Sequence, residues 1–182
     1  MVSYEFVGLI FTGLSISISI IYYANVLRNQ NETRKTQLFM QLHQSKYEQT
    51  GLESMYTLMN LEWENFEDYM EKYGGNTGHI ETASAFTSWI EYYDGIGLLA
   101  KENMIDIETV YNITHSRILF IWFKFETIIK GLREGPWGIP DYLKNFEYLA
   151  NEMIKIRTKK GLPIPYISYI HPKSELYKQY NL

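Results

Sequence analysis

The chain has 182 residues, of which 46% are hydrophobic and 16% aromatic, and it carries 17 basic and 21 acidic side chains. Such a chain is too apolar to be disordered, and it is long enough for one domain with a real core even after a membrane segment is subtracted. The net charge of -4 argues against nucleic-acid binding, which needs clustered Lys and Arg, and the absence of cysteine excludes disulfides, thiolate catalysis and Cys-ligated zinc.

An uncharged run of 22 residues, Phe6 to Leu27, lies near the N-terminus. As a helix it would extend about 33 Å at ~1.5 Å per residue, enough to cross a hydrocarbon core of about 30 Å. A signal peptide would need a basic residue before the run and a small-residue cleavage site after it, but Glu5 precedes the run and Tyr22-Tyr23-Ala24-Asn25 lies at its end. The Ser/Ile alternation over 15–20 is typical of a strand, yet the length of the whole run favours a helix. The sequence therefore predicts one transmembrane anchor over residues 1–28.

The charges flanking this anchor predict its orientation. Arg28, Arg34 and Lys35 follow the run, and no basic residue precedes it. The positive-inside bias places such residues in the cytoplasm. We therefore expect a single-pass protein of the cell membrane with its N-terminus outside and its C-terminal domain in the cytoplasm.

One face of the anchor is a candidate helix-packing surface. Its members step by four, three, four and three residues and are mostly small: Gly8, Thr12, Ser15, Ser19 and Tyr22. Small residues at this spacing let two helices approach closely within lipid. The stripe favours a homo-oligomer or a membrane protein partner, although small residues are common in transmembrane helices and the alternative of a chance alignment stays open.

Residues 29–161 are predicted to form an all-α domain, an antiparallel bundle of about four helices. The charged stretch from Asn29 to Gln37 is expected to continue the anchor helix into water. Apolar residues at spacings of three and four then predict amphipathic helices over 52–73, over about 81–99, after Asp106, and from about Asp141 to Lys159-Lys160-Gly161.

Two features of the predicted bundle concern its interior. Asp94-Gly95-Ile96-Gly97 is expected to bend or end its helix, because glycine disfavours a helix interior. The segment from Ile118 to Phe123 is apolar all round and is placed at the centre of the bundle. We do not expect it to be a second membrane span, because the charged residues within and beside it are costly inside a bilayer. Two of these, Glu126 and Lys130, are spaced as an ordinary i, i+4 ion pair of a water-soluble helix.

The sequence contains no motif that predicts a catalytic residue, a cofactor site or a metal site. None of the four histidines has a second ligand at the spacing of a metal motif. Glu64, Glu67, Asp68 and Glu71 form a carboxylate face that is interpreted as a solvated surface, with a cation site or a basic partner as the alternative. The Tyr-rich segment 162–182 is expected to be an extended tail, and Trp137, Tyr166, Tyr169 and Tyr177 are candidates for an interface.

The middle of the chain resembles a broad prokaryotic family of small membrane-anchored helical proteins with no assigned function. The residues that carry the resemblance are Trp89-Ile90-x-Tyr92-Tyr93-Asp94-x-Ile96-Gly97-x-Leu99-Ala100-Lys101, followed by Ile105-Asp106. The resemblance covers most of residues 1–160. It implies an anchor with a helical bundle, and it implies no activity and no catalytic residue.

Three functions follow as hypotheses. The first is a non-enzymatic interaction protein or an accessory subunit of a larger membrane complex, which binds the lipid bilayer and a membrane protein partner or a second copy. The second is a membrane-tethered signalling or stress-sensing protein, suggested by a continuous helix from anchor to domain. The third is an unrecognised hydrolase or metal-dependent enzyme that uses the carboxylate face or His115.

Overall fold

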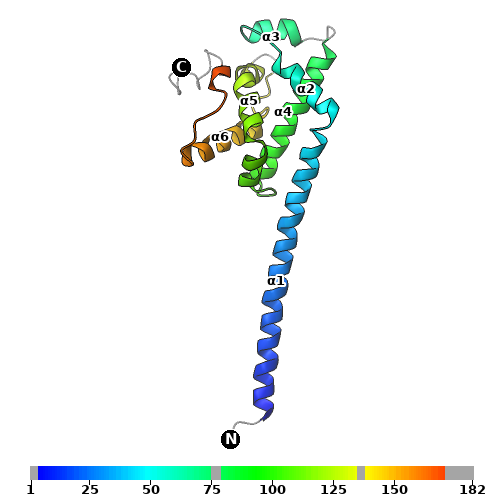
Figure 1. Ribbon diagram of the computed structural model, residues 1–182, viewed down its shortest axis with the longest axis vertical. Helices are drawn as coiled ribbons and strands as arrows, with labels where there is room; N and C mark the ends of the chain where they lie inside the picture. Colours follow the sequence, from blue (N-terminus) through cyan, green and yellow to red (C-terminus); the bar gives the residue numbers. More distant parts are fainter. Residues whose placement is uncertain (1–3, 75–78, 135–137, 171–182) are drawn as a thin grey trace. The chain divides into compact units, whose positions relative to one another are not determined.

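The computed structural model describes residues 4–74, 79–134 and 138–170, and over these residues it is helical without a strand, which confirms the all-α prediction (Figure 1). Two compact units are present, residues 1–42 and residues 43–182, and each is described by itself. The helices are α1 (Tyr4–Ser45), α2 (Gln49–Met59), α3 (Phe66–Tyr73), α4 (Ile80–Lys101), α5 (Ile107–Glu134) and α6 (Lys144–Lys159), followed by the 3₁₀ helix η1 (Ile167–Tyr169).

Helix α1 contains the predicted anchor and continues through the charged residues 29–37, as expected. Within the described ranges it is the one helix that is long and apolar enough to cross a membrane. The large apolar side chains of the run are exposed; Leu9, for example, is 71% exposed. Three of its hydroxyls donate within the helix: Thr12 to the Gly8 carbonyl at 2.9 Å, Ser17 to the Gly13 carbonyl at 2.9 Å and Ser19 to the Ser15 carbonyl at 2.8 Å.

The helix expected over 52–73 is instead two helices, α2 and α3, so that prediction is wrong. The break lies over residues 60–65, which begin and end with asparagine. The Asn60 side chain donates to the Tyr56 carbonyl at 2.8 Å, at the end of α2, and the Asn65 side chain accepts from the Asp68 N–H at 2.9 Å, at the start of α3. Asparagine caps helix ends well because its side chain replaces a missing backbone partner, and here the caps outweigh the apolar periodicity.

The middle of helix α5 lies in the core of the second unit, as predicted. Its six residues from Ile118 to Phe123 are all buried, with at most 5% of any side chain exposed. Asp106 caps its start by accepting from the Thr109 N–H at 2.8 Å. The pair of Glu126 and Lys130 forms with an N–O distance of 2.7 Å, but the Glu126 side chain is only 1% exposed and therefore lies inside the bundle.

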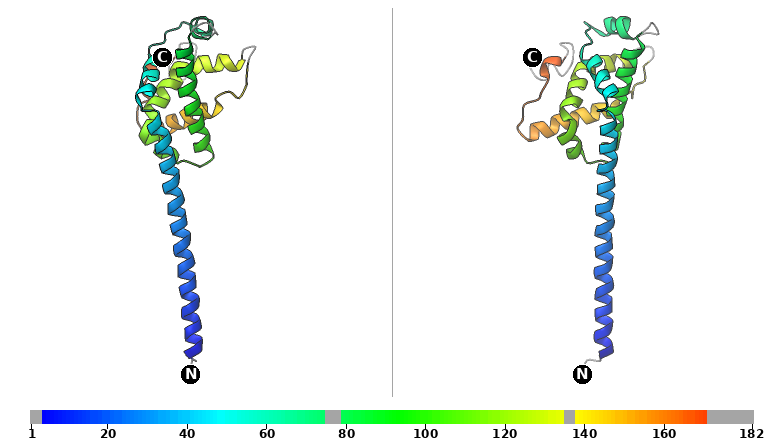
Figure 2. Two further views of the ribbon diagram at one scale, coloured as in Figure 1. Left: turned by 90° about the vertical axis from the view of Figure 1, so that its right-hand side faces the viewer. Right: turned by 45° about the vertical axis from the view of Figure 1, so that its right-hand side comes forward.

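Helix α4 runs unbroken through Asp94-Gly95-Ile96-Gly97 to Lys101, so the expected bend is absent. The segment instead seats α6, which crosses α4 (Figures 1 and 2). The Asp94 carboxylate accepts from the backbone N–H groups of Asn145 and Phe146 at 3.0 and 2.9 Å. A Cβ at Gly97 would lie 2.0 Å from the Asn145 carbonyl oxygen, so only glycine permits this approach.

The end of α6 follows the prediction, and its start does not. The helix ends at Lys159, and Gly161 follows with a φ of 66°, the left-handed conformation that glycine adopts after a helix. Its first residue is Lys144, three positions after the expected Asp141, because residues 141–143 form a turn. Phe146 then enters the core, where its ring stacks on Tyr93 with centroids 5.6 Å apart.

Candidate functional site

The predicted packing stripe of the anchor lies on α1, and all of its residues are exposed: Gly8, Thr12, Ser15, Ser19 and Tyr22. A Cβ added at Gly8 would meet nothing within 4 Å. The hydroxyls of Thr12 and Ser19 are occupied by carbonyls of their own helix. Two hydroxyls of the stripe are thus used within the helix and do not compete with close packing in lipid, and the role of the stripe as a packing surface stays a prediction.

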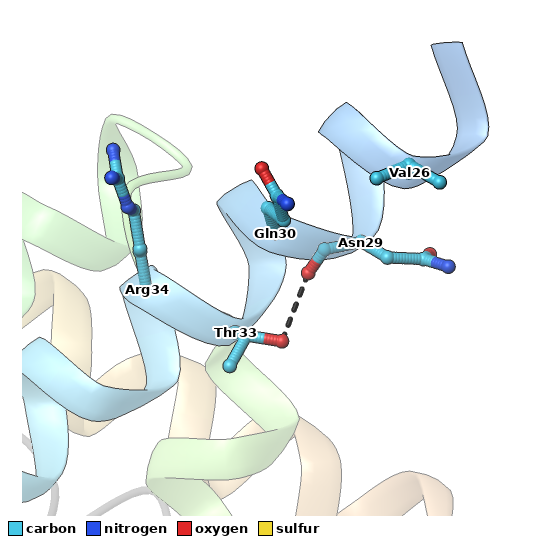
Figure 3. Close-up of a pocket in the computed structure, with 5 residues that line it drawn as sticks. All are labelled: Val26, Asn29, Gln30, Thr33 and Arg34. Carbon is cyan, nitrogen blue, oxygen red and sulfur yellow. Dashed lines mark hydrogen bonds between the residues drawn. The ribbon is translucent and has the colours of Figure 1, made fainter. Parts of the chain in front are cut away.

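A shallow hollow lies farther along α1, lined by Val26, Asn29, Gln30, Thr33 and Arg34 (Figure 3). The Thr33 hydroxyl donates to the Asn29 carbonyl at 2.9 Å, which uses that donor within the helix. Every lining residue comes from successive turns of one helix. Side chains of a single helix cannot enclose a ligand, so this hollow is a feature of the helix surface and not a binding pocket.

The second unit contains an open cleft of about 700 Å³, which we call the Lys124 cleft. Its walls are the linker between α2 and α3, the middle of α5, and η1 with the residue after it. The lining residues are Met59, Leu61, Glu62, Trp63, Glu64, Lys72, Lys124, Ser168, Tyr169 and Ile170. Aromatic and aliphatic side chains thus meet two cations and two carboxylates, a mixture typical of surfaces that bind another molecule.

Lys124 contacts two of the other residues that line the cleft, Met59 and Trp63. Its ammonium donates to the Met59 carbonyl at 2.6 Å and lies 5.4 Å from the centroid of the Trp63 ring. Burial lowers the pKa of this lysine, and the nearby carboxylate of Glu62 opposes that shift. Trp63 is held from behind by Phe125, at 5.0 Å between ring centroids, and by Tyr69, at 5.1 Å. The cation and the aromatic face are therefore fixed in position by the core.

Lys72, the second cation of the cleft, is already neutralised. It lies 2.8 Å from the Asp68 carboxylate, and this hydrogen bond raises the pKa of Lys72 and lowers that of Asp68. The same Asp68 carboxylate accepts from the Glu64 N–H at 2.9 Å. The Asp68 carboxylate therefore binds a backbone N–H just before α3 and the Lys72 ammonium, and it is not a candidate ligand for a metal ion.

The predicted carboxylate face is divided by the structure. Glu64 belongs to the linker before α3, while Glu67, Asp68 and Glu71 lie on α3. Acidic residues in the first turn of a helix complement its dipole, which accounts for Glu67 and Asp68. In the part of the chain that the structure describes, no three His, Cys, Asp or Glu side chains come close enough together to hold a metal ion.

Two of the four predicted interface residues fall on the cleft side of the unit. Tyr166 and Tyr169 pack edge-on against Phe120, with centroid distances of 5.6 and 4.8 Å, and remain 41% and 45% exposed. Tyr169 also lines the cleft. Trp137 and Tyr177 lie outside the described residues.

His115 is engaged by hydrogen bonds at both ring nitrogens. Its Nδ1 lies 2.6 Å from the Tyr111 carbonyl, and its Nε2 lies 2.9 Å from the Arg157 guanidinium. Because arginine has only donors, Nε2 must accept and Nδ1 must carry the proton. Arg157 also donates to the Pro163 carbonyl at 2.8 Å, so the cluster ties the end of α6 to the segment that follows it. Both nitrogens thus serve structural bonds.

A further polar cluster at the start of the second unit is satisfied internally. The Lys46 ammonium donates to the Ser88 carbonyl at 2.9 Å and also to the Ser88 hydroxyl. Arg117 donates to the Tyr47 hydroxyl and stacks over its ring, and His43 lies 3.2 Å from the hydroxyl of Tyr92. These contacts join the first residues of the unit to α4 and α5.

Neither Lys124 nor the cleft was predicted from the sequence. Lys124 is among the charged residues beside the apolar segment of α5, which argue only against a second membrane span. The available signal was that Lys124 is the one charged residue between Ile118 and Phe125, on the most apolar part of α5. Glu62 and Trp63 were missed as linker residues because the expected helix covered them.

Comparison with known protein families gives a match over most of the chain. A family model described as a domain of unknown function (DUF4760) matches residues 5–153. This range begins in α1, ends within α6, and contains Asp94, Gly97 and Lys124. No curated protein and no solved structure matches the chain.

Proposed function

Because the chain belongs to the DUF4760 family of unknown function, we propose from its structure that it is a membrane-anchored, non-enzymatic interaction protein. In this proposal α1 spans the cell membrane, the second unit lies in the cytoplasm, and the protein acts as an accessory subunit of a larger membrane complex. The observation that carries the proposal is the Lys124 cleft, a preformed surface of aromatic and charged residues on a unit that follows an apolar helix.

The anchor supports the membrane part of the proposal. The uncharged run of α1 leaves large apolar side chains exposed along its whole length, and such a surface is stable in lipid but not in water. The basic residues that follow it, Arg28, Arg34 and Lys35, favour a cytoplasmic domain.

This orientation is testable because the chain has no cysteine. Single cysteines at Tyr4→Cys and Lys101→Cys, both at exposed positions, are treated in intact cells with a membrane-impermeant maleimide. We expect labelling at position 4 and protection at position 101 until the cells are lysed. The reverse pattern would refute the orientation, and labelling of both in intact cells would refute the membrane span.

The cleft supports the interaction part of the proposal. Tryptophan and tyrosine dominate the energetics of protein interfaces because they offer a large rigid surface with a polar group. Trp63 is half-buried and packs against Phe125 of the core, and Tyr169, which also lines the cleft, is 45% exposed.

The experiment is purification of the tagged full chain from its own membrane in mild detergent, with mass spectrometry of the proteins that accompany it. We expect a reproducible set of membrane proteins that is reduced by Tyr169→Ala. The control is Tyr56→Ala, because Tyr56 is 63% exposed on α2 and does not line the cleft. A chain that is repeatedly purified without partners would refute the proposal. Equal capture by both variants would place the interface elsewhere.

A second function, membrane-tethered signalling, is favoured by the length of α1. The helix is continuous from Tyr4 to Ser45, so it extends from the apolar run past the basic flank without a break. A chain lacking residues 1–27 should then fail to complement a deletion strain although its domain remains folded. Gln30→Pro should fail in the same way, because proline interrupts a helix interior, whereas Gln30→Ala should complement. Full complementation by the truncated chain would exclude this function.

A further inference from the structure

We infer that the Lys124 cleft receives a partner segment that carries one carboxylate beside a large apolar side chain, with Lys124 as the counter-ion. The inference rests on the proposed interaction function and specifies the partner's chemistry. It follows from the position of the Lys124 ammonium, from the pairing of Lys72 with Asp68, and from the apolar side chains that line the cleft.

The first step is the state of the Lys124 ammonium. It is half-buried, it donates a hydrogen bond to the neutral Met59 carbonyl, and it forms no salt bridge with the described residues. An ammonium has three donors, so capacity remains for another acceptor. Burial lowers the pKa of Lys124 even though the nearby Glu62 carboxylate opposes that shift, so the cost of burying this cation is offset only in part. An arriving carboxylate offsets more of it with a charge-assisted hydrogen bond.

The second step is that this cation is held in place before any ligand arrives. The Met59 carbonyl is the last of α2, where the helix dipole is negative, and the Trp63 ring supplies a second attraction at 5.4 Å. Both partners are neutral groups fixed by the fold. A ligand carboxylate therefore meets a positioned donor and does not have to order a flexible lysine.

Third, the charges that line the cleft favour a ligand with one carboxylate over a ligand with several. Lys72 is paired with Asp68 at 2.8 Å and has no charge left to neutralise. Glu62 and Glu64 also line the cleft and repel any incoming anion; the hydrogen bond to Lys124 offsets this repulsion for one carboxylate, and among the described residues no second unpaired cation lines the cleft to offset it for another. A strongly acidic peptide or a polyphosphate is therefore disfavoured, whereas a single carboxylate is not.

The fourth step is the apolar neighbour of that carboxylate. Trp63 and Leu61 line the cleft from the linker between α2 and α3, and Tyr169 and Ile170 line it from η1 and the residue after it. The volume of about 700 Å³ lies within the range of about 300–1,000 Å³ that binding pockets have. An aromatic or branched side chain in the cleft would bury apolar surface against these residues while its neighbouring carboxylate reaches Lys124.

The test uses the full chain in lipid nanodiscs, with its seven methionines labelled at the ¹³C-methyl group. Met59 lines the cleft and is assigned through Met59→Leu, so it reports binding directly. The probes are N-acetylphenylalanine, which mimics a chain terminus, the tripeptide Ac-Phe-Glu-Phe-NH₂, which mimics an internal acid, and N-acetylphenylalaninamide, which lacks the charge. We expect saturable shifts of the Met59 signal, with at least one acid binding roughly tenfold more tightly than the amide.

Variants separate the charge of Lys124 from its structural role. Lys124→Gln should abolish the preference for the acid, and Lys124→Arg should keep it. Lys72→Gln is the matched control, since it removes a cation from the same cleft that is already paired, and it should keep the preference too. Equal binding of acid and amide, no binding of either, or an unchanged preference in Lys124→Gln would overturn the inference.

The outcome is distinguishable from failure of the proposed function. If purification from the native membrane yields partners for the wild-type chain and equally for Lys124→Gln, the interaction function stands and the carboxylate inference is wrong. If the wild-type chain yields no partner at all, the proposed function fails. The tighter of the two acid probes identifies whether a chain terminus or an acidic side chain is recognised.

Discussion

Replacing Gly97 by alanine should weaken the packing of α6 against α4, whereas the same change at Gly95 should stabilise α4. The new Cβ at position 97 would lie 2.0 Å from the Asn145 carbonyl oxygen and 2.6 Å from its carbon. Both atoms are backbone, so the contact is relieved only if the start of α6 moves, which also stretches its bonds to Asp94. At Gly95 nothing lies within 4 Å.

The magnitude follows from two opposing effects. Overpacking against backbone costs ~3 kcal/mol, the upper end of the usual range, and alanine recovers about 1 kcal/mol of helix propensity. Gly97→Ala should therefore lose about 2 kcal/mol in the free energy of unfolding, whereas Gly95→Ala should gain ~0.5–1 kcal/mol. At ~2–4 °C per kcal/mol for a chain of this size, Gly97→Ala lowers Tm by ~4–8 °C.

The assay is thermal unfolding of the full chain in detergent, followed by tryptophan fluorescence, since Trp89 and Trp122 are buried in the second unit. Gly95→Ala is the matched control because it makes the same chemical change in the same helix at an exposed position. If Gly97→Ala unfolds at the same temperature as Gly95→Ala, then α6 does not rest on Gly97 and the reasoning fails.

Two further changes test the interior of the second unit. Asp94→Ala should lower the free energy of unfolding by ~1–2 kcal/mol, because it leaves the Asn145 and Phe146 N–H groups without their acceptor; an unchanged urea midpoint would contradict this. Tyr93→Phe should be near neutral at pH 8 and stabilising above about pH 10. Burial raises the pKa of Tyr93 above the ordinary value of 10.0, so the unfolded chain loses this proton first and stability falls as pH rises. The advantage of Tyr93→Phe should grow by ~1.4 kcal/mol per pH unit in urea unfolding, and parallel curves for the two proteins would count against it.

Features that depend on local chemistry could be predicted from the sequence. The uncharged run, the cap at Asp106, the all-apolar centre of α5 and the stop at Gly161 each depend on residues within a few positions of one another. The predicted i, i+4 pair of Glu126 and Lys130 is also present. These predictions hold because helix periodicity, capping and glycine conformation act within a turn or two.

Features that depend on contacts distant in sequence were missed or misjudged. Asp94 and Gly97 look like a helix break when only their own segment is considered, and their role appears when Asn145 is placed against them. In the linker after α2, Trp63 continues the apolar spacing of the preceding helix and packs against Phe125, although the backbone of the linker is not helical. The Lys124 cleft combines three segments from positions 59–72, 124 and 168–170, and no local pattern predicts that combination.

The start of α6 has a consequence for the order in which the chain acquires structure. Its N-cap residue, Leu143, has a φ of 57° and provides no side-chain acceptor, so the first N–H groups of the helix depend on Asp94, about fifty positions earlier in the chain. An isolated α6 segment of 16 residues lacks that acceptor and would be at best marginally helical in water. We therefore expect its first turn to form together with its contacts to α4, in one cooperative step. The amides of Asn145 and Phe146 should consequently exchange with solvent through global unfolding, unlike the fraying amides of an ordinary helix end.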